Sequence, residues 1–138
     1  MIGKHDVIRG VTNMRILHTS ITVKDMEASI QFYRDIIGLE LGGRREIPEN
    51  KAEIAFLVDR ESGAQIELTY WWEKEEWQEG DELDHIAFAV PNMDKAMKMF
   101  REQKVEIALE PYSLKGSTSK IAFIKDPNGI WLEIVETQ

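Results

Sequence analysis

The sequence predicts an α+β fold made of two copies of one module, in which a strand and a helix are followed by several strands. The first observation is an internal repeat: HTSITVKDMEASIQFYRDI, starting at His18, aligns without a gap with HIAFAVPNMDKAMKMFREQ, starting at His85. The second is that AFLVDRESGAQIELT in the first half matches AFIKDPNGIWLEIVE in the second, with one residue fewer in the turn. This alignment places Glu67 opposite Glu133, so each half carries one histidine and one glutamate at equivalent positions.

The elements of the first half follow from periodicity and from turn residues. Residues 15–23 predict a strand. Asp25 is a residue type that caps helix N-termini, and Gly38 is expected to end the helix that follows. The apolar residues of that helix recur at a spacing that puts them on one face: Met26, Ile30, Tyr33 and Ile37.

The second half repeats this order. Asn92 occupies the place of the first helix cap, and apolar residues recur after it at helical spacing: Met93, Met97 and Phe100. Strands are expected at roughly 105–109, 120–125 and 130–136. The sequence DPNG at 126–129 predicts the turn between the last two strands.

The composition excludes several kinds of partner and of metal site. The chain has 138 residues, a formal charge of −8 and a pI near 4.9, which argue against a nucleic-acid or anionic-membrane surface. No apolar run approaches the roughly 20 residues that span a bilayer, and the first residues lack the apolar region of a signal peptide, so a cytoplasmic location is expected. Because the chain has no cysteine, any metal must be held by His, Asp or Glu.

Strand alternation places the repeated histidines and glutamates on the polar faces of their strands. His18, Ser20 and Thr22 are expected to point to the side opposite Leu17, Ile21 and Val23, which form the apolar face. In the same way the side chains of Glu67, His85 and Glu133 are opposed by apolar neighbours: Ile66, Leu68, Ile86, Phe88, Leu132 and Ile134. The pseudo-twofold symmetry of the repeat can bring the four polar side chains to one point, which predicts a divalent metal site with positions left open for water or substrate.

The chain resembles the vicinal oxygen chelate superfamily, and within it the glyoxalase I (lactoylglutathione lyase) family, in a similarity that runs from Met14 to about Glu136. The motifs that carry it include RILHT, SIQFYRDIIGLEL, IELTYWW, LDHIAFAV and WLEIVE. The resemblance implies two tandem βαβββ modules that form a cupped, barrel-like mixed sheet with the helices outside. It divides the chain into an N-terminal tail, 1–13, and a domain, 14–138, made of module 14–80 and module 81–138.

The same resemblance implies a metal and a reaction. His18, Glu67, His85 and Glu133 would be the metal ligands, with Glu133 as the principal base and Glu67 as its symmetry mate. The substrate would be the hemithioacetal of methylglyoxal and a thiol, isomerised through an ene-diolate to a lactoyl thioester. Nickel is the favoured metal, with cobalt, zinc and manganese as alternatives. A homodimer is expected, in which the first two ligands come from one chain and the last two from the other.

Other positions bear on substrate binding. Lys115 and Gly116 match the family's mobile loop, and Trp131 matches an aromatic residue near the site. Many glutathione-using members carry an Arg and an Asn where this sequence has Thr22 and Trp71. Because Thr cannot bind a carboxylate bidentately as Arg does, a thiol other than glutathione, or another carbonyl substrate, is an alternative.

Rival functions within the same superfamily are weighed by the ligand set. In acyl-CoA epimerases the corresponding residues resemble the series His, Gln, His, Glu. This chain has Glu67 in the place of the Gln, which argues against that reaction. Extradiol dioxygenases and fosfomycin-modifying thiol transferases need two His and one Glu, which leaves one carboxylate of this chain unused. A metal-free drug-binding protein would have no reason to keep all four residues.

Overall fold

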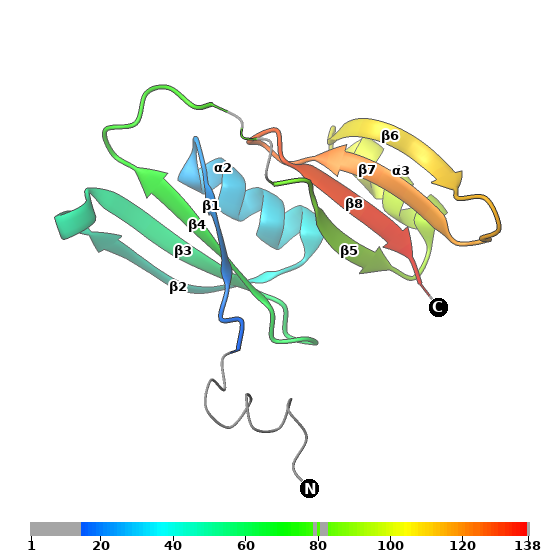
Figure 1. Ribbon diagram of the computed structural model, residues 1–138, viewed down its shortest axis with the longest axis horizontal. Coiled ribbons are helices and arrows are strands. Elements are labelled where there is room, and N and C mark those ends of the chain that lie inside the picture. Colours follow the sequence, from blue (N-terminus) through cyan, green and yellow to red (C-terminus); the bar gives the residue numbers. More distant parts are fainter. Residues whose placement is uncertain (1–14, 79, 81–82, 138) are drawn as a thin grey trace, which may run out of the picture.

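The computed structural model describes residues 15–78, 80 and 83–137. They form two four-stranded mixed sheets that lie beside each other, each with a helix packed on one face (Figure 1). The tail predicted over 1–13 lies outside the described residues. No helix in the described part of the chain is long and apolar enough to cross a membrane.

The first module builds its sheet in the order β1-β4-β3-β2, with β1 parallel to β4 and the other pairs antiparallel. Its elements are β1 (Thr19–Thr22), α2 (Met26–Gln31), the π-helix η1 (Phe32–Ile37), β2 (Glu40–Ile47), the 3-10 helix η2 (Pro48–Asn50), β3 (Ala52–Val58) and β4 (Gln65–Trp71).

The second module has the same topology, β5-β8-β7-β6, with β5 parallel to β8. Its elements are β5 (Ile86–Val90), α3 (Met93–Glu102), β6 (Glu106–Ser113), β7 (Lys120–Lys125) and β8 (Trp131–Glu136). The predicted α+β class and the tandem βαβββ order are therefore confirmed. Among the described residues each sheet forms its own hydrogen-bonded ladder, and no ladder joins the two.

Both helices begin where the sequence predicts. Asp25 Oδ1 accepts a hydrogen bond from Ala28 N at 3.0 Å, and Asn92 Oδ1 accepts one from Lys95 N at 2.9 Å. Gly38 ends the first helix in a left-handed conformation, φ +93°, that glycine adopts without steric cost. The second half of that helix is a π-helix, which the apolar spacing did not predict because a single wider turn leaves the apolar pattern almost unchanged.

Two predicted strands differ in their bounds. The strand expected over 15–23 begins at Thr19, because Thr19 pairs with Ile66 near the start of β4 and the preceding residues have almost no strand to pair with. Leu17 is consequently 62% exposed, and its predicted place on the apolar face was wrong. The strand expected over 105–109 extends to Ser113, because register irregularities around Leu109 interrupt the alternation from which its end was read.

The core lies between each sheet and its helix, with α2 behind β1 and β4 and α3 behind β7 and β8 in the view of Figure 1. Six of the strand residues predicted to face the helices are buried: Ile21, Val23, Ile66, Leu68, Leu132 and Ile134. Ile86 and Phe88 of β5, predicted to lie on the same kind of face, are only partly buried. The helix residues that meet them include Met26, Ile30, Met93, Met97 and Phe100. Because alternate residues face opposite sides of a sheet, burying these side chains leaves the histidine and glutamate faces uncovered by either helix.

A buried polar network joins the first helix to the second module. Tyr33 Oη donates to Asp126 Oδ2 at 2.8 Å, and Asn128 Nδ2 donates to Ser29 Oγ at 3.2 Å. The backbone N–H of Lys24 donates to Asn128 Oδ1 at 2.9 Å. Burial raises the pKa of Tyr33, so its phenol stays neutral and keeps donating to the Asp126 carboxylate. This network fixes the helix of one module against the β7–β8 turn of the other.

Replacing Tyr33 by Phe is expected to destabilise the fold by about 1.5–3 kcal/mol, because the buried Asp126 carboxylate loses a charge-assisted hydrogen bond. Urea unfolding of Tyr33→Phe measures this loss. Tyr112→Phe is the control, since the Tyr112 ring is exposed on β6. A Tyr33→Phe protein no less stable than Tyr112→Phe would contradict the assigned role.

Candidate metal centre

The first histidine and glutamate meet on neighbouring strands of the first module. His18 directly precedes β1, and Glu67 lies on β4, whose residues pair in parallel with those of β1. His18 Nε2 lies 3.4 Å from Glu67 Oε2. Glu67 Oε1 accepts hydrogen bonds from Ser20 Oγ at 2.9 Å and from Thr69 Oγ1 at 3.0 Å. One imidazole nitrogen and one carboxylate oxygen are thus held together by the strand pairing.

The second pair repeats this arrangement. His85 directly precedes β5, Glu133 lies on the parallel strand β8, and His85 Nε2 is 2.8 Å from Glu133 Oε2. His85 Nδ1 is 2.7 Å from Asp84 Oδ1. A hydrogen on Nδ1 would be donated to Asp84 and would leave the Nε2 lone pair to bind a metal, and a carboxylate behind the ring is a common partner of metal-binding histidines.

A phenylalanine stands beside the histidine in each module. Phe56 pairs with Glu67 across β3 and β4, and its ring meets His18 edge-on at 5.3 Å between centroids. Phe123 pairs with Glu133 across β7 and β8 and meets His85 in the same way at 5.6 Å. The two modules therefore present the same three-residue unit, which we call the His–Glu–Phe unit.

The described part of the chain does not bring the two pairs together. No group of three or more His, Cys, Asp or Glu side chains lies close enough among the described residues to hold one metal ion. The expectation that the pseudo-twofold symmetry gathers all four residues at one point is therefore not met within a single chain. Each module supplies one nitrogen and one oxygen donor instead.

The donor set fits a divalent first-row metal when two such pairs are combined. The histidine side chains are 35% and 32% exposed and the glutamate side chains 17% and 20%, so each pair is partly open to solvent. Two imidazoles and two carboxylates are suitable ligands for nickel, cobalt, zinc or manganese. Each pair alone would leave a metal with too few protein ligands for a stable site.

The residues predicted to differ from the glutathione-using pattern contact each other. Trp71 Nε1 donates to Thr22 Oγ1 at 3.3 Å. Thr22 pairs with Thr69, which lies two residues after Glu67 on β4. Because alternate residues share a face, Thr22 and Trp71 lie on the face that carries Glu67. In this place the chain offers a half-exposed indole and no guanidinium.

The other predicted substrate residues lie in the second module. Trp131 shares the face of Glu133, and its ring is 5.5 Å from that of Phe123, which in turn contacts His85. Lys115 and Gly116 lie in the loop between β6 and β7, where Gly116 has φ +85°. Ser119 Oγ ties this loop to the end of β8 by donating to Glu136 O at 2.8 Å. Their roles toward a substrate stay predictions.

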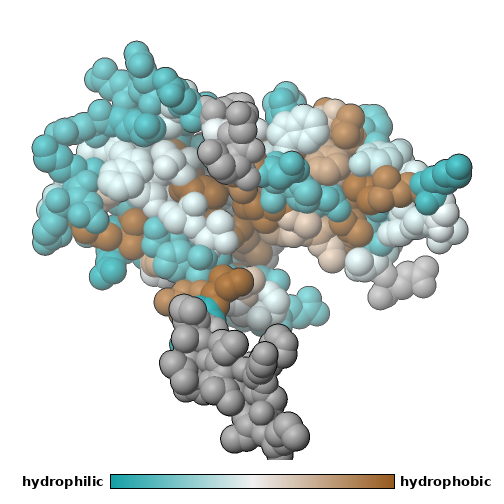
Figure 2. Space-filling view, in the orientation of Figure 1, coloured by the Kyte–Doolittle hydropathy of each residue, from teal (hydrophilic) through white to brown (hydrophobic). Residues whose placement is uncertain are grey.

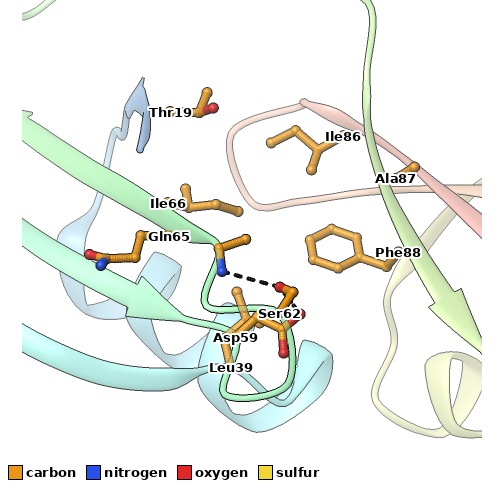
Figure 3. Close-up of a pocket in the computed structure, with 10 residues that line it drawn as sticks. Thr19, Leu39, Asp59, Ser62, Gln65, Ile66, Ile86, Ala87 and Phe88 are labelled. Atoms are coloured by element: carbon orange, nitrogen blue, oxygen red, sulfur yellow. Dashed lines mark hydrogen bonds between the residues drawn. The ribbon is translucent and has the colours of Figure 1, made fainter. Parts of the chain in front are cut away.

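A pocket of about 280 Å³ lies between the modules, and no residue of the His–Glu–Phe units lines it (Figure 3). Ile66, Ile86 and Phe88 line its apolar part. Asp59 and Ser62 line its polar side, where Ser62 Oγ donates to Asp59 Oδ2 at 2.7 Å and accepts from Ala64 N. These polar groups stabilise the β3–β4 turn, and the pocket contains neither a histidine nor Glu67 or Glu133.

Sequence reasoning missed four contacts around the two pairs. Phe56 and Phe123 occupy equivalent places in the repeat, and this equivalence was the signal that could have revealed them. Asp84 precedes a candidate ligand directly, which is a recognisable position for a carboxylate partner. Thr69 lies two residues after Glu67 on the same face, but its hydroxyl becomes informative only once β1 is known to lie beside β4.

Relatives identify the family of the chain. Residues 15–134 match the family model described as the Glyoxalase/Bleomycin resistance protein/Dioxygenase superfamily. The lactoylglutathione lyase of Haemophilus influenzae is 38% identical over 127 residues, which are 91% of this chain and 94% of that protein. The lactoylglutathione lyase of Escherichia coli O157:H7 is 37% identical over 125 residues, 89% of this chain and 93% of that protein.

Solved structures agree with this similarity. The trypanothione-dependent glyoxalase I of Leishmania major superposes with a TM-score of 0.75 at 30% identity, over 89% of this chain and 86% of that one. Glyoxalase I from Zea mays gives a TM-score of 0.80 at 29% identity, over 89% of this chain but 44% of the maize chain. The resemblance read from the motifs is confirmed, and the chain belongs to the Glyoxalase/Bleomycin resistance protein/Dioxygenase superfamily.

Proposed function

We propose that the chain is a metal-dependent isomerase of the glyoxalase I type, which converts the hemithioacetal of methylglyoxal and a thiol into a lactoyl thioester. The observation that carries the proposal is the occurrence of one His–Glu contact at the same place in each module. The similarity of this chain to lactoylglutathione lyases, over about nine-tenths of its length, supports the activity. A protein that only sequestered a drug would need neither pair.

His18, Glu67, His85 and Glu133 would hold one divalent metal per site. The metal, when bound, would polarise the two neighbouring oxygens of the substrate as a Lewis acid. Nickel is favoured, and cobalt, zinc and manganese are the alternatives, because the nitrogen and oxygen donors suit all four.

Glu133 is the proposed base, with Glu67 as its symmetry mate. The reaction moves a proton from the carbon that bears sulfur to the neighbouring carbon, and a carboxylate beside both carbons can accept the proton and return it. Trp131 and the neighbouring apolar rings would limit access of water to that carboxylate, which lessens loss of the proton to solvent.

A homodimer would complete the site. Because each chain offers its donors as two separate pairs, we propose that His18 and Glu67 of one chain meet His85 and Glu133 of its partner. The face of the second sheet that carries Glu133 supports such a contact, since three large residues on it are exposed: Leu109, Tyr112 and Trp131. Figure 2, drawn in the orientation of Figure 1, shows apolar residues gathered across the middle of this face. Exposed apolar patches of this kind often mark protein contacts.

The thiol is proposed to differ from glutathione, or to bind without the usual carboxylate contact. The hydrogen bond between Trp71 and Thr22 supports this, because it joins a hydroxyl in the place of the guanidinium to an indole in the place of the Asn amide, and neither can pair with a carboxylate as a guanidinium does. An indole offers a flat apolar surface on which a bulkier group can stack. The cytoplasmic location expected from the sequence stays a prediction.

Removing one ligand tests the site directly. His85→Ala is expected to lower metal content sharply under mild chelation, because only one of the two imidazole donors remains in each site. Elemental analysis of the purified protein loaded with nickel measures the metal per chain. The third histidine of the chain provides the matched control, and His5→Ala should retain the full content. Full occupancy in His85→Ala would overturn the ligand assignment.

A further inference from the structure

The two His–Glu–Phe units differ in what holds the carboxylate. In the first module Ser20 Oγ and Thr69 Oγ1 both donate to Glu67 Oε1, at 2.9 and 3.0 Å, while the other oxygen faces His18. The two hydroxyls also lie 3.0 Å from each other, so they form a closed triangle with the carboxylate oxygen. Glu67 is thus held from its strand and from the neighbouring strand at once.

The second module lacks both donors. Ser20 pairs with Glu67 in the first ladder, and Ala87 pairs with Glu133 in the second. Two residues beyond each glutamate, Thr69 is replaced by Val135. Neither Ala nor Val has a hydroxyl, and among the described residues Glu133 has His85 as its polar side-chain partner. The module carrying the proposed base therefore leaves that carboxylate freer to move.

We propose that Ser20 and Thr69 are positioning residues that keep Glu67 in place as a fixed ligand, so that the proton transfer falls to Glu133. The inference rests on the proposed isomerase function and explains from this chain's own residues why two symmetry-related glutamates do unequal work. A carboxylate must leave its resting position to reach a substrate carbon, and Glu67 would have to break two hydrogen bonds to do so. Glu133 has no such hydroxyl contacts to break.

The proton balance of the step is simple. Glu133 takes the proton from the carbon that bears sulfur, and the C–H electron pair forms a double bond to the neighbouring carbon, whose carbonyl oxygen accepts the displaced pair. Glu133 then returns the proton to that neighbouring carbon, and the hydroxyl proton passes from the first oxygen to the second. The first carbon ends as the thioester carbonyl, and no oxidant or reductant is consumed.

The modules provide their own matched substitutions. Ser20→Ala with Thr69→Val gives the first module the residues of the second, and the reverse exchange is Ala87→Ser with Val135→Thr. The first measurement is the Kd of Ni²⁺ for the apoprotein, by competition with a chelator. Loss of both hydroxyls should weaken binding by about tenfold to a hundredfold, the usual effect of removing partners that orient a metal ligand. The conservative pair, Ser20→Thr with Thr69→Ser, should restore the wild-type Kd.

The second measurement is a recovery of activity in a Glu133→Gln background. With methylglyoxal, glutathione and nickel, Glu133→Gln should be nearly inactive, and adding Ser20→Ala and Thr69→Val should raise its kcat at least tenfold, about 1.4 kcal/mol, because Glu67 is released to act as the base. Adding the conservative pair should give no such rise. An unchanged Kd together with no recovery would overturn the positioning role in an enzyme that is otherwise active. If the unsubstituted protein forms no thioester with any metal or thiol, the proposed function fails instead.

Discussion

A heterodimer of a His18→Ala chain and a His85→Ala chain is expected to regain about half of the wild-type isomerase activity, although each variant alone is inactive. In the proposed dimer one site receives both substitutions, and the other receives the intact His18 of one chain and the intact His85 of its partner. Co-expression with two different tags and sequential purification yields the heterodimer. Thioester formation and nickel content per dimer are then measured together.

The matched control combines two defects in the same module. A heterodimer of His18→Ala and Glu67→Ala chains should stay inactive, because every site then receives one damaged first-module pair. Recovery in the first heterodimer and none in the second is the pattern of shared sites. If neither heterodimer recovers activity, the four ligands are contributed by one chain, and the arrangement of the modules in the assembled protein must differ from the separated pairs of the single chain.

Introducing the missing guanidinium is expected to improve the use of glutathione. Thr22→Arg with Trp71→Asn places the residue types of the glutathione-using pattern on the face of Glu67, and removes the bond from the indole to Thr22. A charge-assisted contact with a carboxylate is worth roughly 1.5–3 kcal/mol, or about tenfold to a hundredfold in affinity. If the contact is equally strong in the ground and transition states, the gain appears as a lower KM with little change in kcat.

The control for this gain is Thr22→Gln with Trp71→Asn, which offers a polar side chain of similar length without the charge. Steady-state kinetics with the methylglyoxal–glutathione hemithioacetal compares both variants with the unsubstituted protein. A low KM for glutathione in the unsubstituted protein, unchanged by Thr22→Arg, would contradict the proposal of an altered thiol. The wild-type residues would then have to bind glutathione in another way.

Much of the fold could be predicted from the sequence because the chain contains an internal repeat, in which both halves share the same pattern. The repeat placed the caps Asp25 and Asn92 at equivalent positions, and both accept the expected hydrogen bonds. Strand alternation predicted which residues of β1, β4 and β8 are buried, because each of these strands has one helix-covered face. In β5 the predicted apolar residues Ile86 and Phe88 are only partly buried. The equivalence of Glu67 and Glu133 followed from the same alignment.

The remaining features depend on contacts that sequence spacing does not contain. The start of β1 is set by where its partner strand begins, and the length of β6 by irregular pairing around Leu109. The hydroxyl triangle at Glu67 needs Ser20 and Thr69 from different strands, so only the strand order reveals it. The separation of the two pairs depends on how the modules pack, which includes the buried contact of Tyr33 with Asp126.

The most direct measurement of the central claim is metal-dependent turnover by the stripped and reloaded protein. The apoprotein is loaded with nickel, cobalt, zinc or manganese in turn and given methylglyoxal with glutathione and then with other cellular thiols, while thioester formation is followed. The account predicts no turnover without metal, turnover with nickel and at least one thiol, and no turnover by His85→Ala under the same conditions. Equal turnover by the stripped and the loaded protein, or no thioester with any metal and thiol, would contradict it.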